Sequence, residues 1–218
     1  MDAALARQLG AGLNALGVAT TAFQQQLLLD YLALLLKWNR AYNLTAIRDP
    51  GAMVTRHLLD SLAVAPWLAG SRCIDVGTGA GLPGIPLAIA FPEREFHLLD
   101  SNGKKTRFLF QARTALGLDN VTVHHSRAEA FRPEQGFDVV LSRAFASLQD
   151  MLAVTRHLLA PDGVLLAMKG VRPDDELQAI TQHCAVRHIR PLSVPGLDEQ
   201  RHLVELALLP TIDNLHRP

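Results

Sequence analysis

The sequence predicts an α/β fold, in which helices cover both faces of a mostly parallel sheet that ends in an antiparallel hairpin and is preceded by a helical extension. Three observations predict it. Over the first seventy residues, apolar side chains follow a helical spacing with almost no strand pattern. From Arg72 onward, short apolar strands alternate with helices, which is typical of a parallel sheet. Near the end, two strand-like segments are separated only by residues 195–200.

Length and composition indicate one packed domain with a small extension. The chain has 218 residues, of which 49% are hydrophobic and 19% are charged. It therefore has ample apolar surface to bury and does not resemble a disordered chain. Lys and Arg number 21, as do Asp and Glu. A strongly basic surface that binds any polyanion is excluded, so contact with a nucleic acid has to come from a local patch.

Cysteine content and the start of the chain favour a reducing compartment. Cys73 and Cys184 lie far apart in apolar surroundings, and the opening residues lack the basic start of a signal peptide. The most apolar run, 27–36, has about half of the ~20 residues that a membrane span needs. Because no cysteine cluster occurs and His124 and His125 alternate across a strand, we expect no metal site. We expect reduced thiols, a cytoplasmic location and no membrane partner.

The helical extension is predicted for residues 1–70. Apolar side chains recur at intervals of three and four residues from 27 to 38, which indicates one broad stripe on a helix. A second helix is expected from about 52 to 68, because the Asp-Pro pair at 49–50 is typical of a helix start. The segment 39–47 is expected to connect the two helices as a loop.

The sheet and its helices are predicted for residues 71–210, the candidate cofactor-binding domain. The elements follow from the alternation of short apolar runs with helical patterns. The expected strands are 73–76, 96–100, 121–124, 137–141 and 163–168, and the expected helices are 82–90, 104–116, 148–159 and 174–184.

The last two strands, 186–194 and 202–209, identify a particular version of this fold. Their linker is too short for a parallel crossover, which needs about a dozen residues or more, so they form an antiparallel hairpin. A parallel sheet finished by such a hairpin is the Rossmann-like, seven-stranded arrangement of the class I S-adenosyl-L-methionine (SAM)-dependent methyltransferases, an analogy at the level of fold. Residues 211–218 are expected to be a loose tail.

The turn after the first strand is the strongest candidate for a cofactor site. It reads Gly77-Thr78-Gly79-Ala80-Gly81. Glycines allow a sharp turn and let a ligand approach the amides at the start of the next helix. Dinucleotide-binding proteins use the spacing GxGxxG, whereas GxGxG favours SAM, which has no pyrophosphate. We expect Gly77, Thr78, Gly79 and Gly81 to contact the cofactor.

Two aspartates flank this turn. Asp100 ends the second strand, beside Ser101, where a carboxylate can accept both ribose hydroxyls of an adenosine. The alternative is that Asp100 is a solvent-facing cap for the helix that starts near Asn102. Asp75 precedes the turn and can orient the amino group of the methionine moiety, directly or through water. It can equally brace the glycine turn, and the two roles are compatible.

A third cofactor contact is expected after the third strand. Ala128 and Glu129 lie on a loop at the carboxyl edge of the sheet, where ligands bind in such folds. The Ala128 amide and Glu129 would lie beside the adenine. The alternative is that Glu129 merely starts a surface helix.

The end of the fourth strand indicates the type of acceptor atom. Methyltransferases that act on exocyclic amines of bases have an Asn/Asp-Pro-Pro-aromatic turn here, and this sequence has Ser142-Arg143 instead. Guanine N7 has an in-plane lone pair and no proton, so its methylation needs alignment and exclusion of water but no general base. Arg143 can orient substrate or cofactor by bonding to guanine O6 or to a cofactor carboxylate. The alternative is a surface ion pair.

The chain as a whole closely resembles the bacterial 16S rRNA guanine-N7 methyltransferase family, also called small-subunit rRNA methyltransferase G or glucose-inhibited division protein B. The likeness runs from about Leu27 to Leu209. The segments that resemble the family are Trp38-Asn39, Tyr42-Asn43-Leu44-Thr45, His57-Leu58-Leu59-Asp60-Ser61, 75–86, Leu99-Asp100-Ser101, Lys104-Lys105, Ser142-Arg143-Ala144 and Lys169-Gly170.

This resemblance implies a cytoplasmic enzyme that uses SAM, without a metal, and methylates N7 of a guanine in the 530 loop of 16S rRNA. By motif, it implies cofactor contacts at Gly77, Leu82, the Ala128-Glu129 pair and Arg143. One small departure from the family is Lys169-Gly170-Val171, where many relatives have a further glycine, and it leaves only the shape of that loop open.

Lysines near the expected site are candidates for RNA contact. Lys104 and Lys105 open the helix after the second strand, and Lys169 follows the fifth strand. All three fall at the carboxyl edge of the sheet, where they can hold phosphates. A solvated helix face explains the first two equally well.

Polar residues of the extension are weaker candidates. Asn43 and His57, with Thr45 and Arg56 beside them, lie near its loops and can reach a substrate. Capping and hydrogen bonds between helices explain them as well.

The sequence thus predicts a monomeric SAM-dependent methyltransferase whose partner is 16S rRNA or the small ribosomal subunit. Two alternatives stay open. A non-catalytic RNA-binding or assembly factor that kept the fold would bind SAM without methyl transfer. A nicotinamide-dependent oxidoreductase is disfavoured by the GxGxG spacing and the terminal hairpin.

Overall fold

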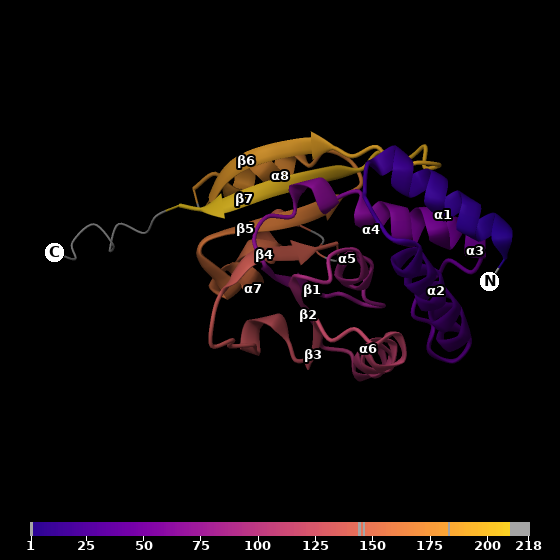
Figure 1. Ribbon diagram of the computed structural model, residues 1–218. Coiled ribbons are helices and arrows are strands. Elements are labelled where there is room, and N and C mark those ends of the chain that lie inside the picture. Colours follow the sequence, from indigo (N-terminus) through magenta and orange to yellow (C-terminus); the bar gives the residue numbers. More distant parts are fainter. Residues whose placement is uncertain (1, 144, 146, 183, 210–218) are drawn as a thin grey trace.

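The computed structural model describes residues 2–143, 145, 147–182 and 184–209. Ala144, part of one family-like segment, and the predicted tail 211–218 lie outside these residues. A central sheet is covered by helices on both faces, and the helical extension packs beside it (Figure 1). None of the described helices is both long and apolar enough to cross a membrane.

The seven-stranded sheet has the predicted arrangement, with strand order β3-β2-β1-β4-β5-β7-β6. Strands β1 to β5 run parallel, and β7 runs antiparallel to both of its neighbours, β5 and β6. The strands are β1 (Arg72–Val76), β2 (Glu95–Asp100), β3 (Val121–His125), β4 (Phe137–Ser142), β5 (Leu159–Lys169), β6 (Cys184–Pro191) and β7 (His202–Leu208). The class I SAM-dependent methyltransferase fold inferred from the terminal hairpin is confirmed.

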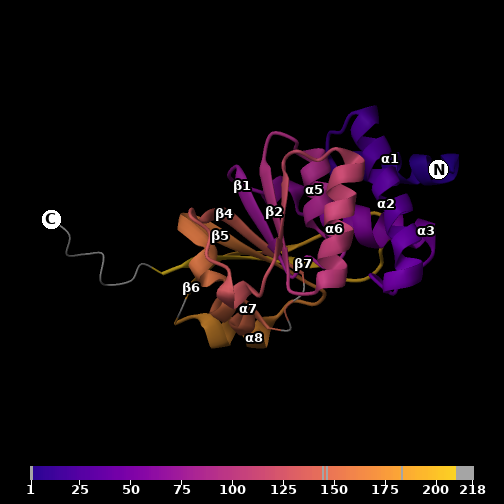
Figure 2. The ribbon, with the colours of Figure 1, turned by 90° about the horizontal axis from the view of Figure 1, so that it is seen from below.

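Two hydrophobic cores lie on opposite faces of this sheet. Helices α5 (Gly84–Ala90) and α6 (Gly103–Leu116) cover one face, and α7 (Leu148–Thr155) and α8 (Asp174–Ile180) cover the other (Figure 2). Phe96 and Phe108 belong to the first core, and Ile74 and Met151 belong to the second. Since β1 and β4 are buried on both faces, their sequences read as continuous apolar runs.

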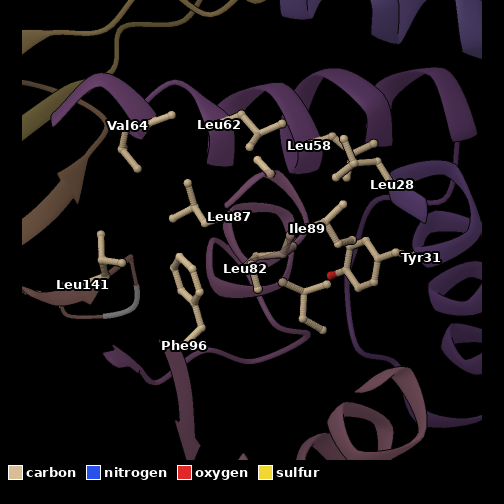
Figure 3. Packing of buried hydrophobic residues seen from close by; sticks show 14 of the residues in the cluster. Leu28, Tyr31, Leu58, Leu62, Val64, Leu82, Leu87, Ile89, Phe96 and Leu141 are labelled. Carbon is tan, nitrogen blue, oxygen red and sulfur yellow. The ribbon is translucent and has the colours of Figure 1, made fainter. Parts of the chain in front are cut away.

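The extension shares the first core with the sheet. It contains α1 (Ala3–Leu16) and α2 (Ala22–Tyr42), the latter started by a capping box of Thr21 and Gln24. Leu28 and Tyr31 of α2 belong to the same core cluster as Leu87 and Phe96 of the sheet region, with Ile89 lying between the two groups (Figure 3). The helices of the extension are therefore held by the same burial of apolar surface that holds the sheet.

The expected helix 52–68 is a chain of short helical pieces. Asp49 caps its start, accepting a bond from the Ala52 amide at 2.7 Å. The pieces are α3 (Pro50–Met53), the π-helical turn η1 (Val54–Leu59), α4 (Asp60–Leu62) and the 3₁₀ turn η2 (Ala65–Trp67). A π-helical turn adds a residue to the helix and is frequent at functional sites. The expectation of one regular helix is wrong in this respect.

Several predicted boundaries are also wrong. Helix α8 ends at Ile180, and Cys184 pairs with Leu208 in the sheet, because its thiol side is buried against the second core. Strand β6 ends at Pro191, and Val194 turns into the first core instead of continuing the strand. Helix α7 stops at Thr155, is followed by the 3₁₀ turn η4 (Arg156–Leu158), and β5 starts at Leu159, earlier than expected.

Candidate functional site

The glycine-rich turn joins β1 to α5 in a conformation that requires glycine. Gly77, Gly79 and Gly81 have φ values of 70°, 62° and 91°. A Cβ at Gly81 would lie 2.5 Å from the Cδ1 atom of Ile85. The Gly77 and Thr78 amides donate to the Leu99 carbonyl at 2.8 and 3.2 Å, which fixes the turn to the end of β2. The spacing GxGxG is therefore set by backbone geometry.

Asp75 braces this turn from inside the protein. Its Oδ2 atom accepts bonds from the Thr78 hydroxyl at 2.6 Å and the Gly84 amide at 2.8 Å. Its Oδ1 atom is buried and has no hydrogen-bond partner among the described residues. Burial raises the pKa of Asp75 to about 6. The bracing contacts expected for Asp75 are present, and Asp75 is not among the residues that line the cavities described below.

Asp100 links the glycine turn to the end of β2. Its Oδ2 atom accepts a bond from the Gly79 amide at 2.9 Å, and its Oδ1 atom accepts one from the Asn102 amide at 2.8 Å. Only 6% of Asp100 is exposed. Helix α6 is capped by the side chain of Asn102, which accepts from the Lys104 amide. The alternative of a solvent-facing cap at Asp100 is therefore wrong.

A cavity of about 190 Å³, here called the β2–β3 cavity, opens at the carboxyl edge of the sheet. It brings together predicted residues from three consecutive loops: Gly77, Asp100, Ser101, Ala128 and Glu129. The last two lie in the 3₁₀ turn η3 (Ala128–Ala130). A carboxylate, backbone amides and apolar walls in one cleft are suited to bind a nucleoside.

A second cavity of about 230 Å³, here called the central cavity, lies on the other side of the glycine turn. Its lining is Leu44, Thr45, His57, Gly77, Thr78, Gly79, Ala80, Leu82 and Arg143. Gly77 lines both cavities, so they adjoin at this residue. The Tyr31 hydroxyl on α2 donates to the Ala80 carbonyl at 2.7 Å, which ties the extension to the turn.

Arg143 reaches from the end of β4 to the extension. Its Nη1 atom donates to the Asp60 Oδ2 atom at 3.1 Å. The Asp60 side chain is only 3% exposed, and its Oδ1 atom accepts a bond from Arg201 Nε at 3.0 Å. The alternative of an ordinary surface ion pair does not describe this arrangement, because one buried carboxylate holds two guanidinium groups.

A third cavity of about 380 Å³, here called the basic cavity, adjoins the central cavity at His57 and Arg143. Its lining is Ile47, Arg56, His57, Asp60, Arg143, Met168, Lys169, Gly170 and Arg201. Four cationic side chains and one carboxylate therefore face this space. The ion-pair partners of these cations, Asp60, Glu176 and Glu199, offset most of the positive charge, so the cavity keeps a small positive excess for an anionic ligand although the whole chain is neutral.

His57 lies in η1, at the junction of the central and basic cavities. Its Nε2 atom is 2.9 Å from the Thr45 hydroxyl, and its buried Nδ1 atom has no partner among the described residues. Burial lowers the pKa of His57 to about 4, so the imidazole is neutral at physiological pH.

The remaining predicted RNA contacts are placed differently. Lys169 Nζ lies in the basic cavity and is 2.9 Å from Glu176. Lys105 Nζ lies 3.7 Å from the Asp100 carboxylate. Lys104 is exposed on α6, and Asn43 caps the end of α2 with a φ of 50°. The capping explanation thus accounts for the backbone at Asn43.

Two charged residues of the basic cavity, Asp60 and Arg201, are absent from the site residues predicted from the sequence. Asp60 has a signal that could have identified it, because it is a charged residue inside the apolar run Leu58 to Leu62. Arg201 has no local signal, since only the folded hairpin brings it to Asp60.

In the described part of the chain, no group of three or more His, Cys, Asp or Glu side chains is arranged to hold a metal ion.

Comparisons with known proteins agree on one family. A family model described as rRNA small subunit methyltransferase G matches residues 24–204. Relatives called ribosomal RNA small subunit methyltransferase G are 57% identical over 203 residues in Ectopseudomonas mendocina (strain ymp) and 56% identical over 202 residues in Pseudomonas aeruginosa (strain LESB58). The matches cover 92% of this chain and 95% and 94% of those relatives.

A solved structure supports the fold. The glycopeptide N-methyltransferase MtfA complexed with SAM matches with a TM-score of 0.58 at 13% identity, over 71% of this chain and 88% of that one. At this low identity the likeness concerns the arrangement of the sheet and helices alone.

Proposed function

The chain belongs to the rRNA small subunit methyltransferase G family, and from this premise we propose that it transfers a methyl group from SAM to N7 of a guanine in the 530 loop of 16S rRNA. It is a SAM-dependent methyltransferase that acts on rRNA. The observation that supports the finer proposal is the pair of cavities that meet the central cavity, one suited to a nucleoside and one to an anionic acceptor.

The residues of the glycine turn fit SAM. In this proposal, Asp100 accepts bonds from the ribose hydroxyls, with Ser101 beside it, and Ala128 and Glu129 flank the adenine. The Oδ1 atom of Asp75 has no partner among the described residues, and we assign the methionine amino group to it through a bridging water, because Asp75 itself lines neither cavity.

The methionine moiety would then lie in the central cavity, between the glycine turn and Leu82. Gly77, Thr78 and Gly79 line this cavity, and the two glycines let a ligand approach the backbone closely because they have no side chain. Gly81 lines neither this cavity nor the β2–β3 cavity, so the cofactor contact expected for it is not supported, and its role is to shape the turn. When bound, SAM supplies an electrophilic methyl group on its sulfonium.

The basic cavity suits an acceptor that needs no deprotonation. Guanine N7 presents a lone pair in the plane of the ring, so the protein has only to align it and exclude water. Arg143 lines both cavities and is held by Asp60, so it can orient the base through O6 without blocking N7. Among the described residues lining the basic cavity, the Asp60 carboxylate is already bonded to two arginines. We assign no general base, because guanine N7 carries no proton that His57 or Asp60 would have to remove.

We propose the following division of the chain. Residues 1–70 complete the acceptor side through His57 and Asp60, and residues 71–210 bind SAM. The protein would act as a monomer in the cytoplasm, on 16S rRNA or the small ribosomal subunit. No role is assigned to residues 211–218.

Methyl transfer to defined RNA tests this function. The purified protein and tritium-labelled SAM would be incubated with small-subunit RNA, as naked RNA and as assembled particles, from a strain lacking this methyltransferase. We expect label in N7-methylguanosine by nucleoside mass analysis, located in the 530 loop. RNA from the parent strain is the control and should accept little label. Label in another nucleoside, or binding of SAM without any transfer, would contradict the proposal.

A further inference from the structure

An ion-pair cluster stands at the rim of the basic cavity. Arg56 of η1 and Arg201, which precedes β7, both line the cavity. Both bind Glu199, which lies in the loop 192–201 between β6 and β7. The proposed function uses Arg143 and Asp60 and leaves this cluster without a role.

The carboxylate of Glu199 is bound as an oxyanion ligand would be. Arg56 donates to both of its oxygens, with Nη1 at 3.0 Å from Oε2 and Nη2 at 2.5 Å from Oε1. Arg201 Nη2 donates to Oε2 at 3.1 Å. The two non-bridging oxygens of an RNA phosphodiester present a similar geometry to a guanidinium fork and carry the same single negative charge as this carboxylate.

The orientation of Arg201 is fixed by the buried Asp60 carboxylate. Its Nε atom donates to the Oδ1 atom of Asp60, while Nη2 points to Glu199. Arg201 is 20% exposed, whereas Arg56 is 39% and Glu199 is 50% exposed. The two arginines are therefore accessible from the rim, and one of them has a fixed orientation.

The loop that carries Glu199 has other anchors. Val194 is 5% exposed, and Leu197 packs against the first core. A Cβ at Gly196 would lie 3.4 Å from the Thr55 hydroxyl, so the loop lies directly on η1 at this point. Because apolar burial fixes the loop, the exposed ion pair contributes little to holding it.

We propose that Arg56 and Arg201 bind a phosphodiester of the RNA backbone beside the acceptor guanine, and that the Glu199 carboxylate occupies this phosphate site in the RNA-free protein. The inference rests on the proposed function, since it needs an RNA acceptor in the basic cavity. An RNA that places no phosphate at this site leaves Glu199 bound to the two arginines and gains nothing from them. The contact therefore disfavours binding of arbitrary RNA.

The ion pair between Arg56 and Glu199 can be broken by substituting either residue. Glu199→Gln removes the competing carboxylate and is expected to lower the KM for small-subunit RNA about threefold to tenfold at low salt. Arg56→Gln removes a phosphate ligand and is expected to raise that KM about tenfold, with a salt dependence reduced by about one phosphate contact. If the pair only holds the loop, both substitutions break the same bond and shift KM in the same direction.

The matched control is Glu93→Gln. Glu93 precedes β2, at the edge of the sheet opposite the cavities, and pairs with Arg94. The substitution Glu93→Gln removes one negative charge, as Glu199→Gln does, and we expect it to leave the KM for RNA unchanged. Thermal melting and SAM binding would be measured for every variant to detect misfolding.

Opposite shifts for the Glu199 and Arg56 variants, with Glu93→Gln unchanged, support the proposal. Shifts in the same direction, or a Glu199→Gln gain that Glu93→Gln reproduces, overturn it. Failure of the wild-type protein to methylate guanine N7 would instead overturn the proposed function, so the two failures are distinguishable.

Discussion

The two sides of the site are assembled in different ways. The proposed cofactor side consists of residues on three consecutive strand-to-helix loops, at 75–84, 100–101 and 128–129. The proposed acceptor side takes residues from η1, α4, the end of β4, the end of β5 and the hairpin loop, including Asp60 and Arg201. The first is a local property of parallel strands, whose carboxyl ends meet at one edge. The second exists only when the extension and hairpin pack against that edge.

This difference predicts that the two sides are separable by mutation. Damage to the glycine turn should remove SAM binding and weaken the fold, because its polar groups are buried. Damage to the Asp60 cluster should weaken RNA use and leave SAM binding intact. The following predictions test this separation, beginning with the largest effect.

Asp75→Ala should have the largest effect. It leaves the Thr78 hydroxyl and the buried Gly84 amide without their acceptor. The free energy of unfolding should fall by about 3 kcal/mol, and SAM affinity should fall at least about tenfold. Urea denaturation and calorimetry measure the two effects. Asp75→Asn, which keeps one oxygen acceptor, should lose less stability; equal losses would contradict the bracing role.

Asp60→Asn should raise the KM for RNA about 30-fold, or about 2 kcal/mol, because Arg143 and Arg201 lose the charge that positions them. SAM affinity should stay within about twofold. Steady-state methylation and calorimetry give the two values. Asp30→Asn, on the exposed face of α2, is the matched control and should change neither. A loss of SAM affinity equal to the loss in RNA use would contradict the separation.

Acid should destabilise the cofactor side of the sheet through His97. Its Nδ1 atom lies 2.8 Å from Nε2 of His124, and burial with this neighbour lowers its pKa to about 4. The unfolded chain, with an ordinary pKa near 6.5, takes up the proton first as pH falls. The contribution of neutral His97 to the free energy of unfolding is therefore fully present above pH 6.5 and is lost as the pH falls toward 4.

The measurement is urea denaturation of wild type and His97→Gln at pH 7.5 and pH 5. Between these values, wild type should lose about 2 kcal/mol more stability than the variant. The subtraction is needed because His57 adds a loss of the same sign and Asp75, whose pKa is raised, adds an opposite one. Parallel pH profiles for the two proteins would refute this assignment.

Tyr31→Phe should have the smallest effect on stability. Tyr31 lies where the helical extension contacts the glycine turn. The substitution removes the donor to the buried Ala80 carbonyl and should lower the free energy of unfolding by about 1 kcal/mol. Tyr42→Phe, on the same helix where Tyr42 stacks on Trp38, is the control and should change stability by under about 0.5 kcal/mol. Indistinguishable denaturation curves for wild type and Tyr31→Phe would show that this bond does not contribute.

Much of the fold was predictable because its signals are local. Alternating apolar runs gave all seven strands, and the short linker at 195–200 gave the hairpin. The predicted ends of elements were wrong where tertiary contacts determine them. Cys184 joins β6 because it pairs with Leu208, and Val194 lies outside the strand because its side chain is buried in the first core. The π-helical turn η1 was not predictable, since its residues have an ordinary helical pattern.

The site divides in the same way. Gly77, Asp100 and Ala128 line one cavity as expected, since consecutive parallel strands end together. Arg143 was expected at the site, but its partner Asp60 lies 83 positions earlier in the chain. Arg201 lies 141 positions from Asp60, so no spacing rule connects them. The resemblance to a family identified the segment around Asp60 without revealing its role.

A crystal structure of the protein soaked with SAM tests the central claim most directly. We predict adenosine in the β2–β3 cavity, its ribose on Asp100, and the sulfonium methyl directed at the basic cavity beside Arg143. Cofactor density in any other cavity, or a methyl group directed away from Arg143, would contradict the account.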